Sequence, residues 1–105
     1  RMPYNCFGWN ALAVAQARSG QLQEAVQSLS DGLQCEPESV SMWSNLAVIY
    51  AYGNLGQQAT EALERAIALN DTHPVTVHNV MVLTGRAQPG TEPQLDLYIP
   101  APGRR

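Results

Sequence analysis

The feature that most constrains the fold of this chain is an internal repeat with a period of 34 residues. A repeat of this length is one supersecondary unit that cannot bury its apolar face alone, so neighbouring units must stack. Trp9 recurs as Trp43, and seven further positions are identical at the same offset. The other identical pairs are Leu12 and Leu46, Ala13 and Ala47, Val14 and Val48, Ala17 and Ala51, Gln23 and Gln57, Ala25 and Ala59, and Leu29 and Leu63. We therefore expect stacked, similar units.

Within each unit the apolar and small residues form two runs at helical spacing. In the first run Trp9, Ala13 and Ala17 share one helix face, and a second apolar stripe starts at Leu22. The pattern recurs in the second unit, and a fifth run follows it. The sequence therefore predicts an all-α fold with helices at about 4–19, 22–34, 40–52, 60–69 and 75–85.

Turn and capping residues fall between these helices. Gly20 can take the positive φ that often follows a helix C-terminus, and Gly53 with Asn54 offers an equivalent turn. Ser39 is suited to the N-cap of the third helix. Pro74 suits the first turn of the last helix, because the N–H that proline lacks would have no intrahelical partner there. These boundaries agree with two helix pairs and a fifth helix.

The repeat resembles that of the tetratricopeptide repeat (TPR) family, whose 34-residue signature has tryptophan, leucine, small residues, an aromatic residue and proline at fixed positions. Repeat one departs from it at Gln16 and Gly32, where an aromatic residue and alanine are usual, and repeat two departs at Asp71, where proline is usual. Repeat one supplies Trp9, Leu12, Ala13, Ala25, Leu29 and Pro37. Repeat two supplies Trp43, Leu46, Ala47, Tyr50, Ala59, Leu63 and Ala66.

The resemblance implies a short right-handed α-solenoid of antiparallel helix pairs over residues 1–85. Repeat one would span about 6–39 and repeat two about 40–73, and a closing helix at about 74–85 would cover the last apolar face. Residues 86–105 contain helix-breaking prolines and glycines and are expected to form an extended C-terminal tail.

In this family the first helix of each pair lines an inner groove. The resemblance therefore implies an apolar floor of Val14, Val48 and Val82 with amide and hydroxyl groups beside it. Asparagine both donates and accepts hydrogen bonds, so it can pair with the backbone of an extended peptide. The alternative is that these are ordinary exposed helix residues. The groove positions are Asn10, Ala11, Val14, Arg18, Ser44, Asn45, Val48, Tyr52, His78, Asn79 and Val82.

Composition narrows the function classes. The chain has a net charge of −3 and no lysine, because all six basic residues are arginine. A Walker A loop and a lysine Schiff base are therefore excluded, and a nucleic-acid-binding surface is not expected. The family's clamp for chaperone carboxylate tails uses lysines and arginines around asparagines. Binding of that kind is not expected, although Asn45 lies at a matching position.

The sequence also lacks a catalytic or metal-binding signature. His73 and His78 are five residues apart, which is poor spacing for a shared metal on a helix. Glu61 and Glu64 are expected on a solvated helix face, and no nucleophile is paired with a base in a recognisable motif. No apolar run approaches the roughly 18 residues of a membrane span. We expect no enzyme activity, cofactor, metal or membrane span.

The two cysteines offer a more specific hypothesis. Cys6 lies where the first helix begins and Cys35 where the second ends, and these ends are neighbours in an antiparallel hairpin. A Cys6–Cys35 disulfide is possible if the compartment is oxidising. The alternative is two buried thiols.

The tail carries an apolar stretch, which is exposed if nothing covers it. It could lie along this domain, occupy a neighbour's groove or dock on a larger partner, so self-association is possible. The stretch consists of Leu95, Leu97, Tyr98 and Ile99.

These observations favour a protein–protein interaction module that binds a partner segment in the groove and scaffolds a complex. The alternative is a structural subunit or chaperone of a bacterial secretion or pilus assembly in the cell envelope. The possible disulfide and the exclusive use of arginine make this alternative admissible. The localisation stays open between the cytoplasm and a bacterial periplasm or envelope.

Overall fold

The computed structural model describes residues 6–70, 72, 74–88 and 90–93, with side chains from residue 8 onward. Within this part of the chain the fold is all-α, with five helices and no strand. The helices are α1 (Cys6–Arg18), α2 (Leu22–Cys35), α3 (Val40–Tyr52), α4 (Gly56–Leu69) and α5 (Pro74–Leu83). All five were predicted from the apolar periodicity.

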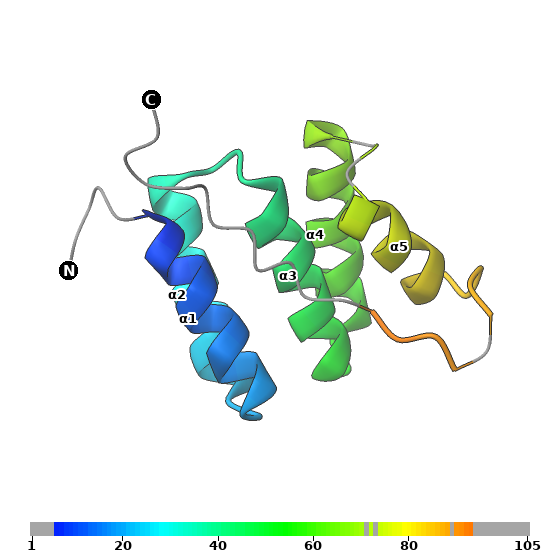
Figure 1. Cartoon of the computed structure of the whole chain (residues 1–105), viewed down its shortest axis with the longest axis horizontal. Coiled ribbons are helices and arrows are strands. Elements are labelled where there is room, and N and C mark those ends of the chain that lie inside the picture. Colours follow the sequence, from blue (N-terminus) through cyan, green and yellow to red (C-terminus); the bar gives the residue numbers. More distant parts are fainter. Residues whose placement is uncertain (1–5, 71, 73, 89, 94–105) are drawn as a thin grey trace.

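Successive helices pack against one another, and α3 lies at the centre (Figure 1). Helix α1 packs along α2, and α3 packs along α4. Helix α3 also contacts α1, α2 and α5, and α5 touches α4 as well. Helices α1, α3 and α5 therefore form a row in which each member touches the next.

The core is an apolar cluster between these helices. Leu29 and Met42 are fully buried, and Ile49 is almost so. Alanines at Ala13 and Ala47 have no exposed surface, and their small side chains let the helix axes approach closely. Burial of large aliphatic side chains at about 25 cal/mol per Å² supplies most of the stability of such a fold.

The helix boundaries follow the local chemistry of the turns. Gly20 has φ +83°, as predicted. In the second turn the left-handed residue is Asn54, at φ +62°, while Gly53 keeps a negative φ. Asparagine tolerates this conformation better than other residues with a Cβ. Helix α4 begins at Gly56, four residues earlier than predicted, because the Ala59 N–H already bonds to the Leu55 carbonyl at 2.9 Å.

Removing the N-cap of α3 should measurably destabilise the protein. Ser39 Oγ accepts a hydrogen bond from the Met42 N–H at 3.2 Å. We expect Ser39→Ala to lower the free energy of unfolding by about 1 kcal/mol, because one N-terminal N–H loses its partner. Urea denaturation monitored by circular dichroism measures this change. Ser39→Asp retains a capping oxygen and should stay close to the original protein; equal losses in the two variants would contradict a capping role.

Candidate functional site

The predicted groove residues lie on the row of helices α1, α3 and α5, and hydrogen bonds join side chains of neighbouring helices. Asn45 on α3 donates from Nδ2 to Asn10 Oδ1 on α1 at 2.8 Å. Asn79 on α5 donates from Nδ2 to Ser44 Oγ on α3 at 3.0 Å. The structure thus brings together four of the predicted residues in two interhelical pairs.

The two hydrogen bonds occupy equivalent places in the repeat. Each joins residues 35 positions apart. At the 34-residue offset, Asn45 corresponds to Asn79, and Asn10 corresponds to Ser44. The donor is an asparagine amide both times, whereas the acceptor changes from an amide oxygen to a hydroxyl. The contact between α1 and α3 is therefore repeated, at this position, between α3 and α5.

Much of the predicted groove is buried. The four hydrogen-bonded side chains, Asn10, Ser44, Asn45 and Asn79, are at most 1% exposed. Every buried side-chain nitrogen or oxygen among the described residues has a hydrogen-bond partner. Because unpaired polar groups are costly to bury, pairing is what allows this row of amides to stay out of water.

The remaining groove residues differ in exposure. Val14 and Val48 are buried, Ala11, His78 and Val82 are half-buried, and Arg18 and Tyr52 are exposed. The exposed residues Arg18 and Tyr52 come from the C-terminal turns of α1 and α3. They are the accessible members of the predicted groove set.

His78 holds the chain that follows α5. Its Nε2 lies 2.8 Å from the carbonyl oxygen of Glu92. Because a carbonyl only accepts hydrogen bonds, Nε2 carries the proton in this contact. The His78 ring thereby fixes residue 92 beside the groove face of α5.

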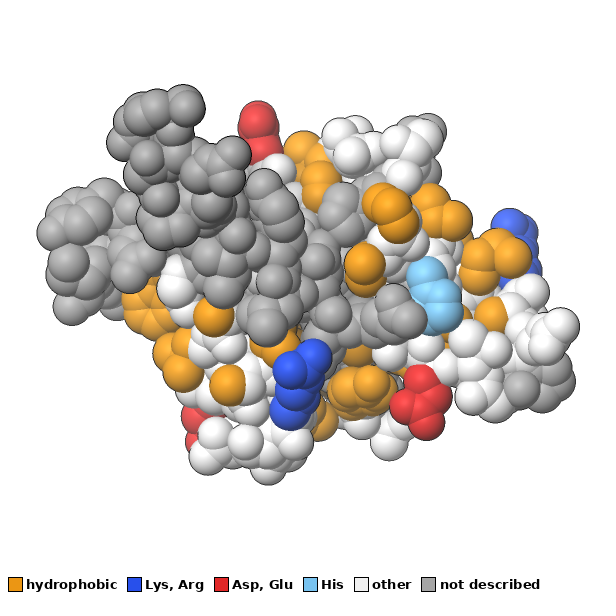
Figure 2. Space-filling view, viewed as in Figure 1, with side chains coloured by type: hydrophobic (Ala, Val, Ile, Leu, Met, Phe, Trp, Pro, Cys, Tyr) orange, Lys and Arg blue, Asp and Glu red, His pale blue; other side chains and the backbone are white. Residues whose placement is uncertain are grey.

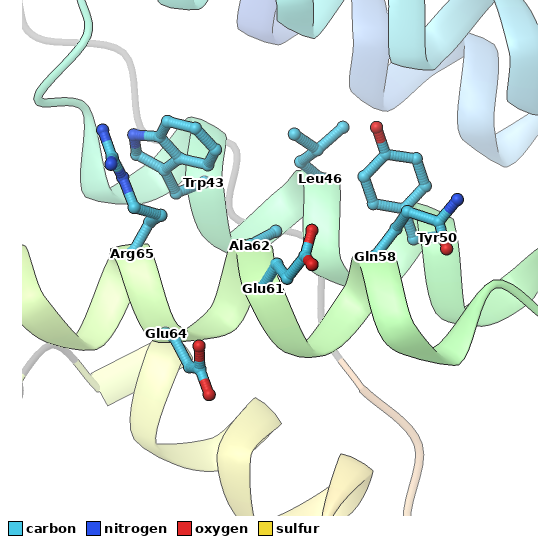
Figure 3. A pocket seen from close by; sticks show the side chains of 8 residues that line it. All are labelled: Trp43, Leu46, Tyr50, Gln58, Glu61, Ala62, Glu64 and Arg65. Carbon is cyan, nitrogen blue, oxygen red and sulfur yellow. The ribbon is translucent and has the colours of Figure 1, made fainter.

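A separate cavity of about 530 Å³ lies between α3 and α4 (Figure 3). Trp43 donates from Nε1 to the Pro37 carbonyl at 2.9 Å, and the Arg65 guanidinium lies 5.0 Å from the ring centroid. Figure 3 shows Arg65 reaching toward Trp43 while Glu64 points the other way. Because the Arg65 guanidinium already covers the Trp43 ring, we interpret the cavity as part of the packing of α4 on α3. Its lining residues are Trp43, Leu46, Tyr50, Gln58, Glu61, Ala62, Glu64 and Arg65.

Helix α5 does not cover the whole apolar face at its end of the molecule. Two smaller cavities, of about 260 and 200 Å³, border α4 and α5 and share Ile67 and Val80. Ile67, Val77 and Met81 are between 36% and 42% exposed. Figure 2 shows apolar side chains gathered over α5.

Several predicted site residues are not described in full. Cys35 is disulfide-bonded, but the side chain of Cys6 lies outside the described residues, so the Cys6–Cys35 pairing stays a prediction. The same applies to His73 and to the tail contact residues Leu95, Leu97, Tyr98 and Ile99.

The described residues offer no obvious centre for metal chemistry or membrane insertion. No group of three or more histidine, cysteine, aspartate or glutamate side chains in this part of the chain could hold a metal ion. None of the helices in the described ranges has the length and apolar character needed to cross a membrane. The row of amides and hydroxyls makes hydrogen bonds between the helices, and the valines beside it are buried or half-buried.

No family model matches the chain, and no curated protein matches it. A functional proposal therefore depends on the packing and hydrogen bonds of its own residues.

Proposed function

We propose that this chain is a helical-repeat interaction module of the TPR type that binds an extended segment of a protein partner and scaffolds a complex. In this proposal the helices form antiparallel pairs stacked as a short right-handed solenoid, and α1, α3 and α5 line the binding groove. The observation that carries the proposal is the hydrogen bond between successive units, which recurs at a separation of 35 residues.

The side chains of the row fit an extended peptide. Each asparagine amide can donate and accept, so a partner that replaces contacts these buried amides already make would pair with them through the alternating N–H and C=O groups of its extended backbone. Val14 and Val48 supply an apolar floor, and Val82 continues it on α5. Side chains that alternate along an extended partner would meet this floor at every second residue. The preferred ligand is therefore an extended segment with alternating apolar side chains.

The proposal differs from the carboxylate-tail clamp used by some TPR proteins. That clamp needs a cluster of cations, whereas this chain contains no lysine. Arg18 is the one arginine among the predicted groove residues. Recognition is therefore assigned to backbone pairing and apolar contact, and the affinity should depend only weakly on salt.

The exposed residue Tyr52 gives a direct test of partner binding. Extended peptides would be selected from a displayed library on the full chain, and their Kd measured by calorimetry. We expect Tyr52→Ala to weaken the binding of a selected peptide about tenfold, because tyrosine is enriched among the interface residues whose truncation costs more than about 1 kcal/mol. Tyr52 is 46% exposed, so this change should leave the fold intact.

Leu69→Ala is the matched control, because Leu69 is an apolar α4 side chain of similar exposure away from the groove row. Its Kd should match that of the original chain. Equal weakening by both changes, or by neither, would count against a groove on α1, α3 and α5.

A second candidate is favoured by one observation. Cys35 is disulfide-bonded, and such bonds persist mainly in oxidising compartments such as the bacterial periplasm. We therefore retain a structural subunit or chaperone of an envelope secretion or pilus assembly as the alternative function. Cell fractionation with thiol alkylation separates the two: a protected Cys35 in an envelope fraction supports this alternative, and a freely alkylated Cys35 in a cytosolic fraction excludes it.

A further inference from the structure

The two valines of the predicted groove floor are buried core residues, but they do not belong to the main apolar cluster between the helices. Val14 is 1% exposed and Val48 is fully buried. Their immediate neighbours Ala13 and Ala47 belong to the apolar cluster between the helices, but the valines do not. Adjacent helix residues point about 100° apart, so the valines face away from that cluster. They lie one helical turn from Asn10 and Asn45, which join α1 to α3, and a segment lying along this row would complete their cover.

The path of the chain after α5 leads toward this face. Gly85, at φ +77°, and the Arg86 and Ala87 N–H groups, which both bond to the Met81 carbonyl, close the end of α5. The chain then brings the Glu92 carbonyl to within 2.8 Å of His78 Nε2. His78 is one of the predicted groove residues, so the described chain ends beside the groove.

The remaining residues are long enough to follow the row of helices. Twelve residues, 94–105, follow Pro93. Extended chain spans about 3.3 Å per residue, or roughly 40 Å for this segment. Packed helices lie about 8–10 Å apart, so the path from α5 across α3 to α1 requires roughly 20 Å. The segment can therefore reach Asn10 from its starting point beside α5.

The composition of the segment suits the groove. Leu95, Leu97 and Ile99 alternate with Asp96 and Tyr98. In an extended conformation the three aliphatic side chains share one face, which can meet the valine floor. Its backbone groups can then meet the asparagine amides. Pro100 and Pro102 disfavour a helix here.

We propose that residues 94–105 dock in the groove of their own chain and act as a built-in competitor for the partner. This inference rests on the proposed function, because it assigns to the same groove a first, internal ligand. A tethered segment has an effective concentration of the order of 1 mM. The partner must displace it, so the apparent affinity is reduced by the fraction of molecules in which the groove is free.

Nuclear magnetic resonance tests the internal docking on the full chain. The test variant carries Leu95→Ser, Leu97→Ser and Ile99→Ser, and the matched control carries Asp96→Ser and Tyr98→Ser on the other face. We expect the side-chain amide signals of Asn10, Asn45 and Asn79 to shift strongly in the test variant and weakly in the control. A synthetic peptide of residues 94–105 should restore the original signals when added to the test variant.

Unchanged asparagine signals in the test variant, or equal shifts in the two variants, would overturn the proposal. If the test variant loses its helical circular dichroism, the single change Leu97→Ala replaces it. A shift of the same three amide signals by Leu97→Ala, reversed by the synthetic peptide, then supports the docking, and no shift refutes it.

Partner binding separates this inference from the proposed function. A library-selected peptide should bind the serine-substituted test variant about tenfold more tightly than the original chain. This factor is expected if the tethered segment has an effective concentration of about 1 mM and binds the groove with a Kd of about 0.1 mM. Equal Kd values would refute the internal competitor while leaving the groove function standing. Amide shifts without binding of any selected peptide would support the internal docking and refute partner binding.

Discussion

Replacing Asn45 with aspartate is expected to lower the free energy of unfolding by roughly 3–5 kcal/mol at pH 7, the loss typical of an uncompensated buried charge. Asn45 is fully buried and donates from Nδ2 to Asn10 Oδ1 at 2.8 Å. A carboxylate has no donor, so two acceptors would face each other. Single domains are stable by only about 5–15 kcal/mol, so much of the stability of this chain would be lost. Urea denaturation at pH 7 measures the change.

The control is Asn54→Asp, which makes the same chemical change at an exposed turn residue. Aspartate also tolerates the positive φ of this position, so the effect should stay within about 0.5 kcal/mol. Burial would raise the pKa of a carboxyl group at position 45. The Asn45→Asp variant should therefore regain stability as the pH falls through that raised pKa. A loss at pH 7 no larger than that of Asn54→Asp would contradict the structural role of the amide row.

Local signals in the sequence were sufficient to predict the helices. Apolar periodicity located all five, and the capping serine Ser39 and the first-turn proline Pro74 set two of their starts. The start of α4 was missed because Leu55 holds the N-cap position without a side-chain hydrogen bond. Neither Gly56 nor the two glutamines after it continue the apolar stripe. A helix that starts on a polar turn leaves no periodic signal there.

The residues of the predicted groove were chosen by their position in the repeat, and this gave no information about their contacts. The 34-residue alignment identifies Asn45 and Asn79 as equivalent residues, and the resemblance to the TPR family assigned both to the predicted groove. Their hydrogen bonds instead run to the preceding unit, at a separation of 35 residues. That pairing depends on how α3 packs against α1, and a comparison of equivalent residues gives no information about this packing. The burial of Val14 and Val48 likewise depends on how the surrounding parts of the chain pack, which their spacing in the sequence does not specify.

Gly32→Ala is expected to destabilise the protein by about 2 kcal/mol, against the usual preference of helices for alanine. Gly32 lies inside α2, where the TPR signature would place alanine. A Cβ added there would lie 2.6 Å from Met42 Sδ and 2.9 Å from Trp9 Cβ. The methionine end can move, but Trp9 Cβ is fixed to the backbone of α1, so α1 and α2 would have to separate. Urea denaturation measures the loss.

The second repeat shows why the same position accepts alanine there. Ala66 corresponds to Gly32 and is fully buried, while Thr76 corresponds to Met42. We expect the smaller threonine to leave room for the alanine methyl group, in the space that methionine occupies in the first repeat. Gly32→Ala should therefore cost less in a Met42→Ala background, and a double-mutant cycle measures that coupling. Additive losses would show that the Trp9 contact alone excludes the methyl group.

Gly56→Ala is the control for the Gly32 prediction, because nothing lies within 4 Å of a Cβ added at Gly56, the first residue of α4. Without a steric conflict the helix preference for alanine should dominate, and the variant should be unchanged or up to about 1 kcal/mol more stable. Stability changes of opposite sign in the two variants would show that the contact between α1 and α2 causes the loss at Gly32. Stability changes of the same sign would instead mean that helix propensity outweighs this contact. The first repeat would then accommodate alanine at this position, as the second repeat does.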